Sequence, residues 1–83
     1  MWFLYVLECS DGSLYTGVTT NIQRRLNEHN SSDRGAKYTK TRRPVKLVWH
    51  KEYSTRSEAQ SEEYRFKKLT RKNKLKIINQ LDK

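Results

Sequence analysis

Arg25 and His29 are the side chains whose types and spacing first suggest chemistry. They stand four residues apart, and positions 22, 25, 26 and 29 follow the spacing of one face of a helix that should begin near Ile22. A guanidinium group can hold an oxyanion, and an imidazole titrates near neutral pH. Arginine is almost never fully buried without a partner, so its place on a core-facing stripe needs an explanation. A functional site is one explanation; the other is a helix at the edge of a small core, with Arg25 laid over Leu26 and His29 capping a local group.

Two strand-like runs and a turn precede this helix and would have to position it. Trp2 to Leu7 is apolar or aromatic at every position, which predicts a central strand covered on both faces. Ser10-Asp11-Gly12 predicts a reversing turn, because glycine accepts positive φ without steric cost. In the second run, Leu14 to Val18, the residues Tyr15 and Gly17 share one face. A glycine inside a strand often marks a close approach by a ligand or another backbone.

The two tyrosines and the arginine helix form an ordered pattern. Tyr5-Val6-Leu7 lies in the first run, Tyr15-Thr16-Gly17 lies in the second, and Arg25 follows ten residues after the second tyrosine, with His29 one turn later. This order and spacing resemble the GIY-YIG nuclease domain, in particular a small single-domain member of that family. Tyr5, Tyr15 and Gly17 are the shared core, while their neighbours depart from the family's commoner letters. The resemblance spans nearly the whole chain.

The segment from Ser31 to Arg43 separates the arginine helix from a third strand. It contains turn formers and charges without a regular period, which predicts a loop. Tyr38 lies among its lysines and could stack on an unpaired base, although packing on its own loop is the commoner outcome for a surface tyrosine. The alternating run Val45 to Tyr53 then predicts the third strand, with Trp49 in the core and His50 exposed. Strict alternation assigns one face to Val45, Leu47, Trp49, Lys51 and Tyr53.

Two further helices are expected after the third strand. Thr55-Arg56-Ser57-Glu58 has the form of a capping box, which predicts a helix reaching about Leu69. Thr70 can cap a last helix. Its expected core face consists of Leu75, Ile78 and Leu81. The expected architecture is an α/β fold: a small, mostly antiparallel three-stranded sheet flanked by helices in the order β-β-α-β-α-α, forming a single domain over residues 1–83.

Composition points to a polyanionic partner. The net charge is +9, with 34% hydrophobic and 33% charged residues, so the core is small and the surface heavily charged. Two stretches, 34–51 and 65–76, each carry seven lysines and arginines and no acid. Such blocks favour nucleic acid, whereas a single block would be the ordinary solvated surface of a soluble protein. Cys9 is the only cysteine, which excludes an internal disulfide and predicts a small buried thiol.

The resemblance implies a metal site on the helix after the third strand. Family members carry a metal-binding glutamate there, and both Glu62 and Glu63 flank the apolar stripe of the expected helix. Periodicity does not choose between them, but the match to the family indicates Glu63. It would hold one divalent ion, Mg²⁺ or Mn²⁺, which needs few protein oxygens. The alternative for Glu63 is a surface ion pair with Lys67 at i+4.

The resemblance also implies roles for the other members of the catalytic set. Arg25 would face the scissile phosphate, Tyr5 would act as general base beside Tyr15, and His29 would assist proton transfer. A phenol titrates near 10, so this role requires positive charge that favours the phenolate, and Arg25 and the metal would supply it. Ordinary strand packing is the alternative for both tyrosines. Expected nucleic-acid contacts are Arg24, Arg34, Lys37, Tyr38, Lys40, Arg42, Arg43, Lys67, Lys68, Arg71 and Lys72.

The expected function is that of a metal-dependent endonuclease that hydrolyses phosphodiester bonds in DNA rather than RNA. It would be selective for single strands or branched structures, in repair or recombination, with a protein partner for targeting as a further option. Two alternatives remain open: a basic binding module without cleavage, and an accessory subunit of a repair complex anchored through Trp2 or Trp49. The apolar run after Met1 is too short for a signal-peptide core or a membrane span, so a cytoplasmic protein without a membrane partner is expected.

Overall fold

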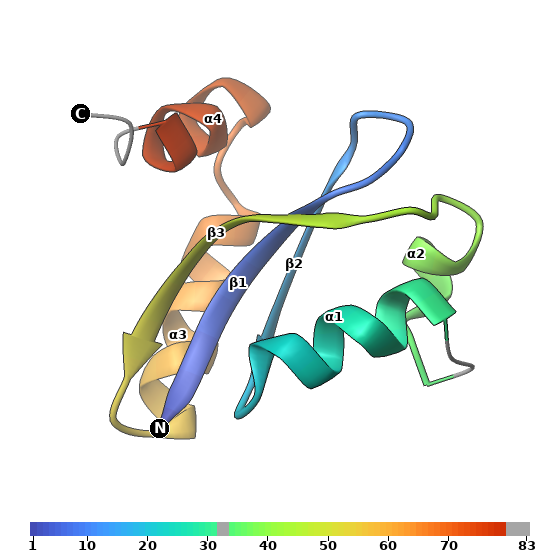
Figure 1. Ribbon diagram of the computed structural model, residues 1–83. Helices are drawn as coiled ribbons and strands as arrows, with labels where there is room; N and C mark the ends of the chain where they lie inside the picture. Colours follow the sequence, from blue (N-terminus) through green and yellow to red (C-terminus); the bar gives the residue numbers. More distant parts are fainter. Residues whose placement is uncertain (32–33, 80–83) are drawn as a thin grey trace.

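A three-stranded antiparallel sheet with helices on both faces forms the fold in a computed structural model that describes residues 1–31 and 34–79 (Figure 1). The strands β1 (Trp2–Glu8), β2 (Leu14–Thr19) and β3 (Lys46–Tyr53) lie in the order β2-β1-β3. β1 is antiparallel to both neighbours. The expected α/β fold and the central place of the first strand are therefore confirmed.

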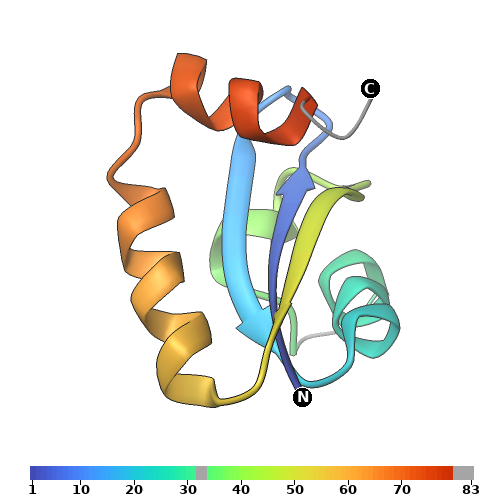
Figure 2. The same ribbon diagram turned by 90° about the vertical axis from the view of Figure 1, so that its left-hand side faces the viewer.

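The helices cover the sheet unequally. Helix α1 (Ile22–Ser31) and the short helix α2 (Lys37–Lys40) lie on one face, α3 (Arg56–Lys67) lies on the other, and α4 (Arg71–Asn79) crosses one end (Figure 2). The expectation of a loop throughout 31–43 is wrong at its centre. The amides of Thr39 and Lys40 donate to the Ala36 carbonyl and close a single helical turn. One turn is too short to produce a readable hydrophobic period.

Alternate residues of β1 contribute to two small cores. Leu4 and Val6 face α3 and pack with Phe66, while Tyr5 and Leu7 face α1. Cys9, beyond the end of β1, joins the second group and is buried, as expected for a small thiol. A strand buried on both faces needs the continuous apolar run that this sequence has. Tyr5 is therefore held in a central strand beneath α1.

A β-bulge in β3 overturns the strict alternation expected there. Val6 pairs with Trp49 but Leu7 pairs with Leu47, so Val48 is an extra residue with no partner on β1. Leu47 packs on the α1 side, whereas Val48 and Trp49 both pack on the α3 side. The prediction that Leu47 and Trp49 share a face is thus wrong, because the extra residue rotates the strand by one position.

Local hydrogen bonds explain where the elements begin and meet. Gly12 has φ 85° in the β1–β2 turn, and Thr55 and Glu58 form the expected capping box of α3. The Asn30 side chain bonds both the amide and the carbonyl of Val45, at 2.7 and 2.9 Å, and so fixes the end of α1 to the start of β3.

The last helix differs in part from its expected core face. Ile77 and Ile78 pack against the α3-side core, while Leu75 is half-buried outside it. Leu81 lies outside the described residues.

Candidate active site

Tyr5 and His29 form the centre of the site. The Tyr5 hydroxyl lies 3.0 Å from Nε2 of His29, and the two residues are only 3% and 0% exposed. The Tyr5 ring crosses directly over Gly17 of β2, where a Cβ atom would lie 2.5 Å from the hydroxyl oxygen. Gly17 is therefore required by the close approach of a side chain of this chain, rather than by a ligand or a backbone.

His29 bridges three elements rather than capping a local group. Its Nδ1 lies 2.8 Å from the Thr39 hydroxyl of α2, while its Nε2 meets β1. Burial lowers the pKa of the imidazole to about 4, and the charges of Arg25 and Arg43 act in the same direction. His29 is therefore neutral at pH 7, with one nitrogen able to accept a proton.

Tyr15 and Tyr38 extend the aromatic side of the site. The Tyr15 ring meets His29 edge-on, with centroids 5.1 Å apart, and stacks with Tyr38 at 6.0 Å. The guanidinium carbon of Arg42 lies 3.9 Å from the Tyr38 ring centroid. Tyr38 thus packs against side chains of its own chain, which was the commoner of the two outcomes weighed for it.

Arg25 is held at the rim of the site by fixed partners. Its NH1 donates to Glu28 Oε1 at 3.0 Å and to the Arg34 carbonyl at 2.7 Å. Burial lowers the pKa of the guanidinium, but the hydrogen bond to Glu28 and the influence of the nearby Tyr5 side chain outweigh burial and leave the pKa above its ordinary value. The side chain is 26% exposed, so one part of a fixed cation faces solvent. Such a group can hold an oxyanion without reorganising.

Two charges from different helices act on the Tyr5 phenol. Burial raises its pKa to about 12; the Arg25 side chain acts in the opposite direction, and the charge of Glu63 on α3 raises the pKa further. The expectation that Arg25 would favour the phenolate is correct in direction, but burial outweighs it. Arg25 and Glu63 are nevertheless both within electrostatic reach of the same hydroxyl.

Glu62 and Glu63 differ in their surroundings, although the periodicity of the helix does not distinguish them. Glu63 is the more buried, with 20% of its side chain exposed, and pairs with Lys67 at 3.1 Å as one of the two alternatives expected. Glu62 is 40% exposed and lies 3.6 Å from Arg65. No group of three or more metal-ligating side chains occurs within residues 1–31 and 34–79. A single half-buried carboxylate fits a cation that keeps most of its waters, as Mg²⁺ does.

Residues 1–76 of this chain match the family model of the GIY-YIG catalytic domain. The chain belongs to the GIY-YIG family. Among relatives, it is 50% identical to a UPF0213 protein of Desulfotalea psychrophila, covering 99% of this chain and 74% of that one. It is 53% identical to a UPF0213 protein of Streptococcus agalactiae, covering 94% and 88%.

Two solved structures support the same assignment. The solution structure of a protein from E. faecalis matches with TM-score 0.65 and 50% identity over 96% of this chain and 84% of that chain. The solution structure of a UPF0213 protein of Bacillus halodurans matches with TM-score 0.61 and 42% identity over 95% and 84%. The expected resemblance is therefore confirmed, and with it membership of a nuclease domain family.

The cations expected to contact nucleic acid are differently placed in this GIY-YIG domain. Arg42 and Arg43 are half-buried: Arg42 pairs with Asp11 at 3.1 Å, and Arg43 donates to the His29 and Glu28 carbonyls at the end of α1. The others are exposed, and they are Arg24, Arg34, Lys37, Lys40, Lys67, Lys68, Arg71 and Lys72. Their contacts with nucleic acid stay a prediction.

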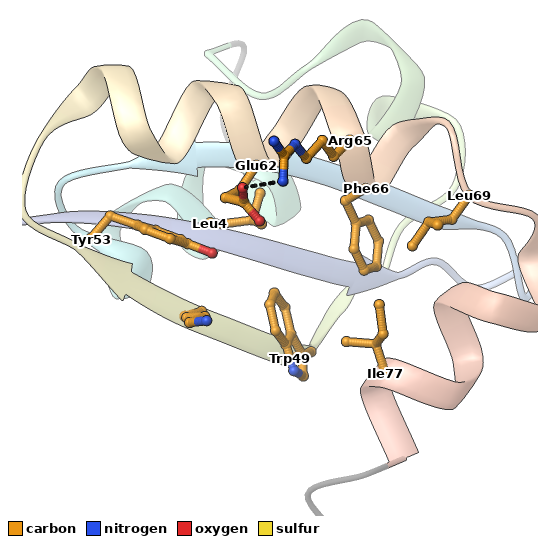
Figure 3. A pocket seen from close by; sticks show the side chains of 9 residues that line it. Leu4, Trp49, Tyr53, Glu62, Arg65, Phe66, Leu69 and Ile77 are labelled. Carbon is orange, nitrogen blue, oxygen red and sulfur yellow. Dashed lines mark ion pairs between the residues drawn. The ribbon is translucent and has the colours of Figure 1, made fainter.

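A separate apolar pocket of about 390 Å³ lies among β3, α3 and α4 (Figure 3). Its walls include Trp49, which stacks on Phe66 with centroids 5.8 Å apart, together with Leu69 and Ile77. The polar groups at its rim include the Glu62–Arg65 pair, and the side chains around Tyr5 do not line it. This pocket is therefore distinct from the candidate active site.

The GIY-YIG motif residues alone did not reveal two partners in the site. Glu28 is three residues after Arg25, a spacing that places them together on a helix and could have identified the pair. Thr39 has no such signal, because it lies ten residues after His29 in a segment that appeared irregular.

Among the helices in the described part of the chain, none has both the length and the apolar character that a membrane span requires.

Proposed function

We propose that this chain is a metal-dependent endonuclease that hydrolyses phosphodiester bonds in DNA, acting on single-stranded or branched substrates in repair or recombination. The observation that carries the proposal is the buried Tyr5–His29 hydrogen bond, on which Arg25 and Glu63 both act. Ordinary strand packing explains a buried tyrosine. It does not explain a cation and a carboxylate whose charges both act on the same hydroxyl, at the positions that the family's spacing selects.

The pKa of Tyr5 bears on how this residue would act. In the protein without a bound cation that pKa is about 12, so a preformed phenolate would cost about 7 kcal/mol at pH 7. We infer instead that the attacking water gives its proton to the Tyr5 oxygen while the Tyr5 proton passes to Nε2 of His29. The water oxygen forms a bond to phosphorus as the bond to the 3′ oxygen breaks. The leaving oxygen takes a proton from solvent, and the His29 imidazolium releases its proton to solvent, which restores the starting state.

The remaining residues stabilise charge in this reaction. Arg25, fixed by Glu28 and the Arg34 carbonyl, would hold the non-bridging oxygens of the phosphate as negative charge develops on them. Glu63 would hold a divalent cation, which when bound supplies positive charge at the phosphate and the leaving oxygen. The Lys67 ammonium lies 3.1 Å from the Glu63 carboxylate and would have to move away before the cation could bind there.

A second candidate function rests on the basic surface and the apolar pocket. A binding module or accessory subunit would need only the exposed cations of α2, α3 and α4, with a partner seated where Trp49 lines the pocket. Either function predicts DNA affinity that falls steeply with salt, because phosphate contacts release counterions. Cleavage separates the two.

The test is cleavage of labelled single-stranded, duplex and branched DNA, with Mg²⁺ or Mn²⁺ and with a chelator. Tyr5→Phe keeps the ring and removes the hydroxyl, while the exposed Tyr64→Phe is the matched control. We expect metal-dependent product from wild type and from the control, and a loss of at least about 10²-fold for Tyr5→Phe. DNA binding without product from any substrate would overturn the proposal in favour of the binding module.

A further inference from the structure

Thr39 contacts His29 on the side away from Tyr5. Thr39 and His29 are each 0% exposed, and their Oγ1 and Nδ1 atoms lie 2.8 Å apart. The Thr39 hydroxyl also lies 2.9 Å from the Ala36 carbonyl, to which it can donate. A hydroxyl has one proton, so Thr39 either donates it to Ala36 and accepts from His29, or donates it to His29.

These two arrangements require opposite tautomers of the neutral imidazole. If Thr39 donates to Ala36, Nδ1 of His29 carries the ring proton and Nε2 presents a lone pair to the Tyr5 hydroxyl. If Thr39 donates to His29, Nε2 carries the proton and donates to Tyr5. In the second case the Tyr5 oxygen receives a hydrogen bond from His29, and its own proton has no acceptor among the described residues.

One contact favours the second arrangement and has to be weighed. The Ala36 amide points at Nδ1 of His29, but at 3.4 Å this is the longest bond in the cluster. In the second arrangement both this amide and the Thr39 hydroxyl would donate to the single lone pair of Nδ1. The first arrangement keeps the 2.8 and 2.9 Å bonds and gives the Tyr5 proton an acceptor. It has two costs: the weak amide contact is lost, and the Thr39 hydroxyl becomes a third donor to the Ala36 carbonyl, beside the longer bonds from the Thr39 and Lys40 amides at 3.1 and 3.2 Å.

We propose that Thr39 is a positioning residue that fixes His29 in the tautomer with its proton on Nδ1, so that Nε2 is free to accept the Tyr5 proton. Its effect on catalysis rests on the proposed phosphodiester hydrolysis, whereas the tautomer itself does not. Thr39 acts through His29 and does not touch the reacting atoms. Its place on α2 assigns the short helix a role in orienting the histidine on α1.

The test compares Thr39→Val with Thr39→Ser. Valine matches the shape of threonine without a hydroxyl, so Nδ1 loses its acceptor. The nearby Ala36 amide would then favour a lone pair on Nδ1 and the proton on Nε2. Serine keeps the hydroxyl and should keep the wild-type tautomer. Denaturant unfolding of both variants shows whether either fails to fold.

The first readout is long-range ¹⁵N NMR of the histidine rings at pH 7, which distinguishes protonated from unprotonated ring nitrogens. We expect a protonated Nδ1 on His29 in wild type and Thr39→Ser, and a protonated Nε2 in folded Thr39→Val, with the exposed His50 unchanged in all three. A wild-type His29 protonated on Nε2 would overturn the proposal. So would a tautomer that is the same in Thr39→Val.

The second readout is single-turnover cleavage. We expect Thr39→Val to slow cleavage by about 10²-fold or more at unchanged DNA affinity, and Thr39→Ser to restore most of the rate. Equal rates for Thr39→Val and wild type would overturn the catalytic part. If wild type cuts no substrate, the proposed function fails, and the NMR result still decides whether Thr39 sets the tautomer.

Discussion

Replacing Gly17 by alanine should separate the cost to folding from the cost to activity. The new Cβ would lie 2.5 Å from the Tyr5 hydroxyl oxygen and 2.8 Å from the ring carbon that bears it. Ordinary contact begins at 3.4 Å, so the end of Tyr5 must retreat by about 0.9 Å. A shift of that size is enough to disturb the contact between the hydroxyl and Nε2 of His29, which is now 3.0 Å long. Overpacking of this kind costs about 1–3 kcal/mol, because the far end of one side chain moves rather than the backbone.

Activity should suffer more than stability. A displacement near 1 Å at a reacting group lowers the rate by about 10²-fold. The assay is single-turnover cleavage beside denaturant unfolding, with Gly12→Asn as control. Gly12 has φ 85° and open space around it, and asparagine tolerates that conformation.

A double-mutant cycle with Tyr5→Phe tests the cause of this loss. Once the hydroxyl is absent, Gly17→Ala should lower the rate little further. The reasoning is refuted if Gly17→Ala cuts at the wild-type rate, or if its effect on the rate is undiminished in the Tyr5→Phe background.

Three further predictions concern α1. The pKa of His29 is about 4 in the folded protein, against an ordinary value of 6.5. Between pH 4 and 6.5 the unfolded chain therefore binds more protons than the folded protein. The free energy of unfolding should fall by up to about 3 kcal/mol as the pH drops from 6.5 to 4. In urea unfolding, His29→Gln should lose this component and His50→Gln should keep it. Arg25→Lys should slow cleavage by at least about 10-fold with less than about 1 kcal/mol lost in unfolding, whereas Arg56→Lys, at an exposed position of α3, should leave the rate unchanged. Asn30→Ala should cost about 2–3 kcal/mol of unfolding free energy, because it leaves a buried backbone amide and carbonyl unpaired.

Each of these has an outcome that would contradict it. A pH dependence that is the same with and without His29 would mean that burial does not lower its pKa. A wild-type cleavage rate for Arg25→Lys would mean that charge alone matters and the fixed geometry of Arg25 does not. An Asn30→Ala variant as stable as Asn27→Ala, an exposed position on the same helix, would remove the proposed tie between α1 and β3.

The parts of the fold that sequence predicts are those set by local rules. A continuous apolar run gives the central strand β1, Asp11-Gly12 gives the turn, and Thr55 with Glu58 gives the start of α3. In each case one short stretch contains both the cause and the consequence. The bulge at Val48 is different, because it appears only when β3 is registered against β1.

The sequence indicated which residues belong to the candidate site but not which of them contact one another. Spacing and the family resemblance selected Tyr5, Arg25 and His29, and the structure brings Tyr5 into contact with His29. Spacing could not show that burial would outweigh the effect of Arg25 on the pKa of Tyr5, since burial depends on all the elements that pack around this side chain. It also could not place Thr39, because that contact is made by a helix of four residues.

The most direct test of the nuclease account compares Glu63→Gln with Glu62→Gln. Both substitutions keep shape and remove one charge from adjacent positions of α3, and only Glu63 acts on Tyr5. DNA affinity and single-turnover cleavage would be measured together in Mg²⁺. We predict that Glu63→Gln binds DNA at least as tightly as wild type and cuts at least about 10²-fold more slowly, while Glu62→Gln cuts normally. Wild-type cleavage by Glu63→Gln, or equal loss in both variants, would contradict the account.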